Sequence, residues 1–320
     1  TKGIFKKHSR TEISFYFATV NHFCTISTTS HLYKTYALAE SLRKIGHSFM
    51  LHVLVTDGPE TLTHEHCTFY GLKMLAGDTT GKQIEKKYSS NPDKLRWSMK
   101  PVFMLHLLRT VTDKVVYIDN DQYFYSDYTF LFQLLGHQSI LLTPHYYKHS
   151  PASEQNWLEA NFKVGLYNAG FVGASAQGQE SLQWWAACCL YRCEKNMLRG
   201  LFDDQKYLDL IPVIDNKALV LRHQGCNVAG WNTDYCTRSI IDGRVMINKE
   251  YPIVFVHFNA FTIQEIASGR DPLLLPLYEE YVACLKKYNT DLKTTDMLGK
   301  PSLMEKLKYY IWAKATALGL

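Results

Sequence analysis

The sequence predicts an α/β fold with a mixed, mostly parallel central sheet flanked by helices. Two apolar runs, 49–55 and the β-branched 114–118, have the length and composition of buried strands. Helical patterns at 30–45 and 97–108 precede them. Such alternation of helix and strand is typical of βαβ units, whose ligands bind outside the carboxyl ends of the strands.

The elements at the start of the chain continue this alternation. We expect the first strand at 14–20, an aromatic and β-branched run, and a polar loop at 22–29. The helix at 30–45 ends at Gly46, a residue suited to the left-handed conformation that terminates many helices. No internal repeat is visible, and the glycine-rich second half is expected to extend the same sheet.

Length and composition limit the size of the domain and the kinds of ligand and compartment to expect. A chain of 320 residues with 46% hydrophobic residues is long enough for one large domain. A formal net charge of +5 suits an anionic ligand or an acidic membrane surface and does not indicate nucleic acid. The eight cysteines lack a Cys-x-x-Cys spacing, which favours reduced thiols in the cytosol over a zinc site. The apolar stretches are too short to span a bilayer, and we expect a cytoplasmic protein.

Two carboxylates follow the 114–118 strand. Asp119 and Asp121 are separated by one residue, so on an extended chain their side chains point the same way and can converge. Hard cations such as Mg²⁺ and Mn²⁺ bind carboxylate oxygens and keep positions for substrate phosphates. The pair predicts a holder for a metal–diphosphate, with a solvated strand-end turn as the alternative interpretation.

Four further segments carry the polar residues that such a site needs. A strand at 165–172 contains a single amide among apolar and small residues, and acids and an amide open a helical turn at 201–209. A loop at 223–232 is rich in Gly and Asn, and a strand at 253–257 ends in an imidazole.

With these elements in this order, the chain resembles the GT-A nucleotide-sugar glycosyltransferases. Within them it is similar to the retaining enzymes of glycosyltransferase family 8 and to related bacterial polysaccharide transferases. The resemblance extends from Ile13 to Phe261. It implies a GT-A (Rossmann-like) catalytic domain over 1–265 and leaves 266–320 as a C-terminal helical extension.

The resemblance also implies roles for individual residues. It assigns Mn²⁺ or Mg²⁺ to Asp119, Asp121 and His257, with Asp119 also near the ribose. The loop that lines the nucleoside corresponds to Ala18, Thr19 and Asn21, and Asp57 stands at a strand end that could meet the base or ribose. The positions that hold the donor sugar correspond to Asn168, Asp204 and Gln205, with Gln205 nearest the reacting face.

Cleavage of a sugar–diphosphate bond places negative charge on the leaving phosphate and positive charge on the ring. A divalent cation offsets the first, and Lys100 or Arg96 can add fixed positive charge. The family has no strongly nucleophilic carboxylate on the reacting face, and here Gln205 is the nearest match. We therefore expect retention by a same-face, ion-pair-like displacement, which a covalent glycosyl adduct on Asp203 or Asp204 would contradict.

The chain departs from the family pattern after the late histidine. The family often has Gly there and then a Lys that grips the diphosphate, and residues 258–261 contain neither. Lys249 and Arg270 are the candidates that remain for this role.

Structural interpretations stand beside these roles. Asn168 suits a buried backbone partner, and His257 on an apolar strand suits a satisfied core histidine. Of the adjacent acids, Asp203 is the expected helix cap, which leaves Asp204 for chemistry. Trp231, in a Gly-rich loop, fits sugar stacking and core packing equally well.

Two aromatic segments remain. The pair Trp184–Trp185 lies in a helical pattern and favours core packing. Residues 302–320 carry an apolar stripe with lysines and flanking aromatics, which predicts a helix for peripheral membrane contact or for packing on a partner.

The predicted protein is a metal-dependent, retaining glycosyltransferase that moves a hexose from a nucleoside diphosphate sugar, expected to be a UDP-sugar. Its acceptor would be a saccharide or lipid-linked saccharide in cell-surface polysaccharide or lipopolysaccharide synthesis at the inner face of the membrane. A non-catalytic nucleotide-sugar-binding module of the same fold is the alternative. A sugar nucleotidyltransferase would need a Gly-rich phosphate loop, which 20–23 lacks, and a two-metal hydrolase would need more His and Asp ligands.

Overall fold

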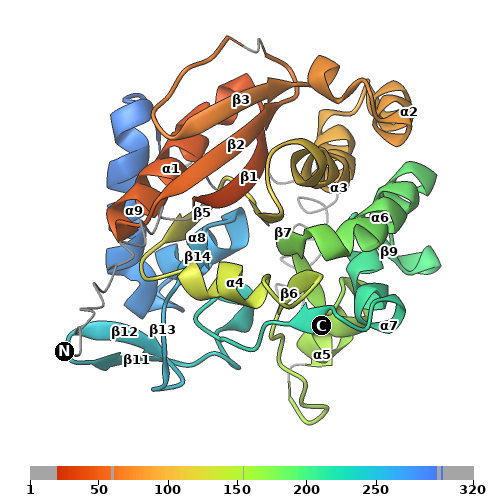
Figure 1. Cartoon of the computed structure of the whole chain (residues 1–320). Coiled ribbons are helices and arrows are strands. Elements are labelled where there is room, and N and C mark those ends of the chain that lie inside the picture. Colours follow the sequence, from red (N-terminus) through yellow and green to blue (C-terminus); the bar gives the residue numbers. More distant parts are fainter. Residues whose placement is uncertain (1–19, 59–60, 154, 294–296, 298–320) are drawn as a thin grey trace, which may run out of the picture.

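The computed structural model describes residues 20–58, 61–153, 155–293 and 297, which fold around a central sheet of seven strands (Figure 1). In spatial order the strands are β10 (Leu219–Val220), β6 (Ile140–Pro144), β7 (Tyr167–Ser175), β4 (Lys114–Ile118), β1 (Asn21–Ser27), β2 (Phe49–Val55) and β3 (Cys67–Gly71). Only β7 runs antiparallel to its neighbours in this sheet. The predicted mixed, mostly parallel sheet is therefore confirmed.

Helices cover both faces of the sheet, which explains why its central strands are continuously apolar. On one face lie α2 (Thr79–Tyr88), α3 (Pro92–Thr110) and α6 (Gln179–Tyr191), packed together in one core cluster. On the other lie α1 (Leu32–Ile45) and α4 (Thr129–Leu134). The helix α9 (Leu275–Tyr288) packs beside α1.

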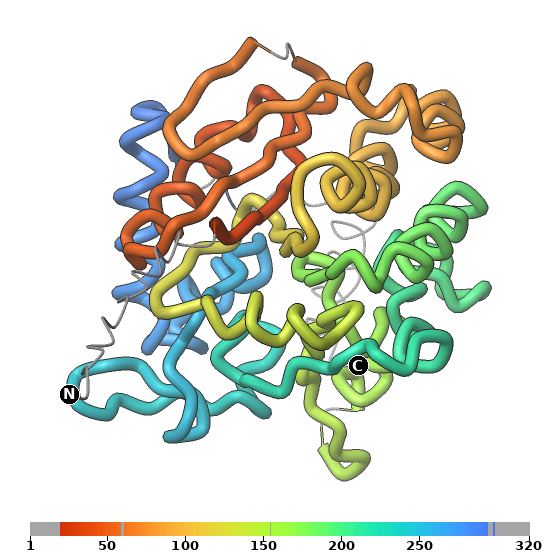
Figure 2. The backbone as a smooth tube through the Cα atoms, in the orientation of Figure 1, coloured from red at the N-terminus to blue at the C-terminus, as the bar shows by residue number. Residues whose placement is uncertain are grey.

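A second, smaller strand pair lies next to the main sheet. β5 (Gln122–Phe124) pairs antiparallel with β14 (Phe255–His257), although more than a hundred residues separate them. Figure 2 shows how the late, blue part of the chain returns to the middle of the molecule beside the yellow segment that follows β4. This return places a late histidine next to the end of β4.

The remaining strands and helices are short. The strands are β8 (Glu194–Asn196), β9 (Leu201–Asp203), β11 (Arg238–Ile241), β12 (Arg244–Ile247) and β13 (Tyr251–Pro252). The α-helices are α5 (Gln155–Lys163), α7 (Ile211–Ile214) and α8 (Ala260–Ala267). Single 3₁₀ turns lie at η1 (Thr29–His31), η2 (Leu72–Leu75), η3 (Ala176–Gly178), η4 (Met197–Arg199), η5 (Lys206–Leu210), η6 (Gly230–Asn232) and η7 (Pro272–Leu274).

The expected loop at 22–29 is wrong, because residues 21–27 form β1 in the centre of the sheet. Its polar residues misled the prediction, since Thr25 and Ser27 are fully buried between neighbouring strands. The strand expected at 14–20 ends where β1 begins, and residues 14–19 lie outside the described part of the chain. The predicted helix at 97–108 is part of the longer α3, whose first turn is capped by Asn91.

Two expectations concern the C-terminal region. Within the described ranges, no helix combines the length and the hydropathy needed to cross a membrane. The amphipathic helix expected at 302–320 lies outside the described residues. The division of the chain at residue 265 stays a prediction, and α8 continues across that position.

Candidate metal and donor site

Three potential metal ligands meet where β4 ends. Asp119 and Asp121 occupy the short turn between β4 and β5, and the register of β14 places His257 opposite Gln122. One ligand atom from each of the three side chains lies within 4.8 Å of the others. The imidazole Nε2 is 3.1 Å from Asp121 Oδ1 and 4.0 Å from Asp119 Oδ2. This is a spacing that could hold a metal ion.

The neighbouring strand leaves room for this cluster by means of a glycine. A Cβ atom on Gly170 of β7 would lie 2.7 Å from His257 Cε1 and 2.8 Å from Asp119 Oδ2. The carbonyl of Gly170 accepts hydrogen bonds from Asp119 N at 2.9 Å and from Gln122 Nε2 at 2.8 Å. The same Gln122 amide lies 3.3 Å from His257 Nδ1 and thus holds the ring by its second nitrogen.

The chemistry of the cluster fits a hard divalent cation. Two carboxylates and one imidazole are ligands that Mn²⁺ accepts, and Mg²⁺ favours the carboxylates. Burial alone would raise the pKa of Asp121, but the charge and hydrogen bond of His257 outweigh it and hold that pKa well below its usual value. Burial alone would lower the pKa of His257, and the two carboxylates raise it instead. The cluster is thus electrostatically arranged for a positive charge.

A buried lysine forms ion pairs with both the Asp119–Asp121 turn and an acid of the 201–209 segment. Lys100 Nζ, on α3, lies 3.4 Å from Asp119 Oδ1 and 3.2 Å from Asp204 Oδ2, and it donates to the carbonyl of Ala169 at 3.0 Å. Burial alone would lower the pKa of Lys100, but Asp119 and Asp204 raise it, so the ammonium stays charged. Burial also raises the pKa of Asp204 to about 6.

The two predicted sugar-holding amides form one network. Gln205 Oε1 accepts hydrogen bonds from Ala169 N at 3.2 Å and from Asn168 Nδ2 at 3.3 Å. Asn168 Oδ1 accepts from Gly170 N at 2.9 Å. His145, which sequence reasoning missed, lies 3.2 Å from Asn168 Nδ2 through its Nε2. Burial lowers the pKa of His145 to about 3, so this imidazole is neutral and can accept that hydrogen bond.

The expectation that Asp203 caps a helix is wrong. It is the last residue of β9, with a φ of 50°, and its carboxylate is 3.5 Å from Lys195 Nζ. The 3₁₀ turn that follows has Gln205 at its N-cap, without a side-chain cap. The predicted core role of the adjacent tryptophans holds for Trp185, whose buried indole donates to the carbonyl of Asp204 at 2.8 Å.

A small pocket lies at the carboxyl edge of the sheet, beside the Asp119–Asp121 turn. Its volume is about 260 Å³, and Arg96 and Lys100 line it together with Asp119 and Asp121. Sequence reasoning missed two further cationic or titratable residues there, His31 and Lys34. Both lie in the segment 30–45, which was predicted as a helix without a role in the site.

Asp57 and Asn21 do not line this pocket. Asp57 accepts from Thr29 N at 2.8 Å and so ties the loop after β1 to the end of β2. Asn21 begins β1 and donates to Ser48 O at 3.2 Å, at the opposite edge of the sheet from the Asp-x-Asp turn. Ala18 and Thr19 lie outside the described residues.

Lys249 and Arg270, the remaining candidates for gripping the diphosphate, do not line this pocket either. Lys249 lies in the turn between β12 and β13, and the guanidinium of Arg270 pairs with Glu265.

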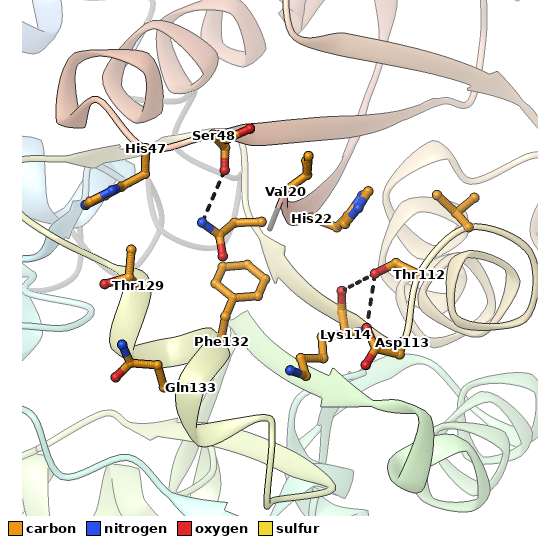
Figure 3. Close-up of a pocket in the computed structure, with 12 residues that line it drawn as sticks. Val20, His22, His47, Ser48, Thr112, Asp113, Lys114, Thr129, Phe132 and Gln133 are labelled. Atoms are coloured by element: carbon orange, nitrogen blue, oxygen red, sulfur yellow. Dashed lines mark hydrogen bonds between the residues drawn. The ribbon is translucent and has the colours of Figure 1, made fainter. Parts of the chain in front are cut away.

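Figure 3 shows the opposite edge, where Val20, His22, Asp113 and Lys114 from the starts of β1 and β4 surround a larger hollow of about 850 Å³. Size alone does not make it the active site, because ligands of parallel sheets bind at the carboxyl ends of the strands.

Comparison with known protein sequences identifies relatives of this chain. No protein-family model matches it. The uncharacterized protein YfnF of Bacillus subtilis (strain 168) is 27% identical over 256 residues, which cover 76% of this chain and 82% of YfnF. YfnD of the same organism is 30% identical over 253 residues, which cover 76% of this chain and 78% of YfnD. The chain belongs to the YfnD family.

Several solved structures similar to this YfnD-family chain are glycosyltransferases. They include galactosyltransferase LgtC, with 14% identity over 74% of this chain and 86% of LgtC and a TM-score of 0.48. Mouse xyloside xylosyltransferase 1 has 14% identity over 76% of this chain and 99% of its own, with a TM-score of 0.49. GlyE of Streptococcus pneumoniae TIGR4 has 16% identity over 88% of this chain and 62% of GlyE, with a TM-score of 0.48. Because these scores are below 0.5, we base the functional conclusion on the residues of the site itself.

Proposed function

We propose that this YfnD-family protein is a metal-dependent glycosyltransferase that moves a hexose from a nucleoside diphosphate sugar to a saccharide acceptor. The observation that carries the proposal is the convergence of Asp119, Asp121 and His257 beside the buried cation of Lys100. A metal–diphosphate holder next to a network of buried amides is the combination that a nucleotide-sugar donor needs.

Asp119, Asp121 and His257 would hold Mn²⁺ or Mg²⁺. When bound, the cation neutralises the diphosphate and supplies Lewis-acid assistance to the departing phosphate. Lys34 and Arg96 line the same pocket and offer further positive charge to the phosphate oxygens. We infer that they take the phosphate-gripping role for which the sequence suggested Lys249 or Arg270.

The sugar would lie against the amides of Asn168 and Gln205. Their hydrogen bonds to each other and to the backbone of β7 hold these amides in place before the donor arrives. Gln205 remains the residue assigned to the reacting face.

The nearby acids are poorly placed to serve as nucleophiles. Asp204 is buried and paired with Lys100, and Asp203 is buried and paired with Lys195. Neither presents a free carboxylate, which supports retention by a same-face, ion-pair-like displacement over a double displacement.

The donor is expected to be a UDP-sugar, and the acceptor a saccharide chain, free or lipid-linked, of cell-surface polysaccharide synthesis. These parts of the proposal rest on the resemblance described above. Peripheral membrane contact through residues 302–320 belongs with them. Deletion of 301–320 should abolish binding to anionic vesicles, and unchanged vesicle binding would remove the membrane role.

The experiment that tests the proposal is a thermal-shift panel of UDP-, GDP- and CMP-linked sugars, each with Mn²⁺ or with EDTA. Ligands that bind only the native state stabilise it by mass action, by about 2.7 kcal/mol at a hundredfold excess over Kd, and thereby raise the melting temperature. One donor should give a metal-dependent shift that Asp121→Ala abolishes. The matched control is Asp113→Ala, because Asp113 is an exposed acid at the other end of the same strand. A panel without any metal-dependent shift would overturn the proposal.

A further inference from the structure

A second pocket, outside the predicted donor site, lies beside the metal ligands. Its volume is about 410 Å³, near the lower end of the roughly 300–1,000 Å³ typical of ligand pockets. Trp157, Trp231 and Phe261 line it with Asp234, Glu265 and Arg270. We propose that this pocket binds a pyranose ring of the acceptor saccharide, an inference that rests on the proposed function.

The apolar wall of the pocket is built from rings on three separate elements. Trp157 of α5 meets Phe261 of α8 edge to face, with 5.8 Å between ring centroids. On its other side Trp157 stacks on Tyr147 at 5.4 Å. Both Trp157 and Phe261 are partly exposed, so their rings are available to a ligand. The C–H face of a pyranose is an apolar surface that packs well on such rings.

Polar groups of both kinds accompany these rings. Glu265 and Asp234 supply carboxylate oxygens, which accept hydrogen bonds from sugar hydroxyls, and Arg270, paired with Glu265, supplies donors. Each carboxylate has a cationic partner, Arg270 for Glu265 and Lys148 for Asp234, so these polar groups carry little net charge. An aromatic wall with acceptors and donors around it suits a neutral polyhydroxylated ring.

The loop that carries Trp231 is held rigidly. The side chain of Arg238 is almost inaccessible to solvent, donates to Ala229 O at 2.8 Å and pairs with Asp271 at 3.1 Å. Thr262 Oγ1 accepts from Gly230 N at 3.0 Å and joins the loop to α8. A wall held in this way loses little conformational entropy when a ligand binds.

Trp231 also connects the pocket to the metal ligands. Its ring meets His257 edge to face, with 5.3 Å between centroids, and packs against His145 at 5.8 Å. Among the described residues its Nε1 has no hydrogen-bond partner, although the atom is buried. A buried unpaired N–H costs about 1–3 kcal/mol, so core packing alone does not account for an indole at this position. A sugar unit in the pocket would therefore lie next to the residues that hold the donor.

The test is direct binding of methyl pyranosides to the full chain by saturation-transfer NMR, with methyl glucoside, galactoside, mannoside and N-acetylglucosaminide as probes and inositol as the non-pyranose control. At least one methyl pyranoside should bind, and Trp157→Ala should weaken its binding by about tenfold, which is roughly one stacking contact. Trp157→Phe, which keeps a ring, should retain most of the binding. Trp184→Ala is the matched control, because Trp184 is a partly buried tryptophan of α6 outside the pocket.

The outcomes separate this inference from the proposed function. The Mn²⁺-dependent thermal shift with the donor should be unchanged in Trp157→Ala, because that residue lies outside the donor pocket. If no methyl pyranoside binds, or if Trp157→Ala and Trp184→Ala weaken binding equally, the pocket is not a sugar site. If the protein binds a pyranoside but shows no metal-dependent thermal shift with any donor, the proposed function is contradicted and the assignment of the sugar pocket is retained.

Discussion

Lys100 Nζ lies 3.2 Å from Asp204 Oδ2, and both side chains are almost completely buried. The same ammonium is 3.4 Å from Asp119 Oδ1, so one buried cation compensates an acid on each of two segments. The turn that carries Asp119 and Asp121 and the 201–209 segment are thereby linked through Lys100, in the middle of α3.

Removal of this cation should destabilise the fold. Lys100→Met keeps the approximate shape of the side chain but leaves two carboxylates without their partner, a loss of about 3–5 kcal/mol for a buried pair. The free energy of unfolding of each variant is measured by urea denaturation. The control is Lys195→Met, whose exposed ammonium pairs with Asp203 and should contribute about 0–1 kcal/mol. Adding Asp204→Asn to Lys100→Met should recover part of the loss, and equal effects of the two lysine variants would contradict the assignment.

Gly170→Ala should impair the metal site more than the fold. The added methyl group would lie 2.6 Å from Asn168 Oδ1 and 2.8 Å from Asp119 Oδ2, so a ligand must shift. We expect Mn²⁺ affinity, measured by electron paramagnetic resonance, to fall by about tenfold or more, as for loss of a residue that orients ligands. Gly173→Ala is the comparison on the same strand, because the three atoms nearest to its methyl group would all belong to Leu141, at 3.1–3.3 Å. Mn²⁺ affinity that is equal in the two variants would count against the placement of the ligands.

The free energy of unfolding should fall as the pH is lowered, because of a buried histidine away from the candidate metal ligands. Burial, with smaller contributions from His22 and His106, lowers the pKa of His52 to about 4. In the unfolded chain the same imidazole takes up a proton near pH 6.5. The folded state is therefore at its full stability above pH 6.5 and loses stability relative to the protonated unfolded chain as pH falls toward 4. Between pH 7 and pH 5 wild type should lose about 2 kcal/mol more than His52→Gln in urea unfolding. The comparison variant is His66→Gln, which removes a partly exposed histidine and leaves the buried His52 in place.

The stereochemical outcome tests the roles of the acids. With a donor of known anomeric configuration, the first-formed product should keep that configuration when it is followed by proton NMR. Mass spectrometry of the denatured protein should find no glycosyl group on Asp203 or Asp204. An inverted product, or a covalent adduct on either acid, would refute the same-face displacement.

Local patterns predicted part of this architecture and not the rest. Asp119 and Asp121 were recognisable because the spacing of two acids after an apolar strand is a local property of the chain. His257 joins them only through the pairing of β14 with β5, and the resemblance, not its own neighbours in sequence, pointed to it. His145 directly follows β6, next to the antiparallel β7, and no local signal reveals that sheet order. Residues 22–29 were predicted as a loop because they are polar, although Thr25 is buried in β1.

The central claim is metal-dependent chemistry on a nucleotide sugar, and its most direct measurement is release of the nucleoside diphosphate. The donor selected by the thermal-shift panel is incubated with wild type and Asp121→Ala, each with Mn²⁺ or EDTA, and a saccharide acceptor is then added. We predict release that requires Mn²⁺, rises with the acceptor and disappears in Asp121→Ala, while Asp113→Ala remains active. Release that persists in EDTA or in Asp121→Ala would contradict the account.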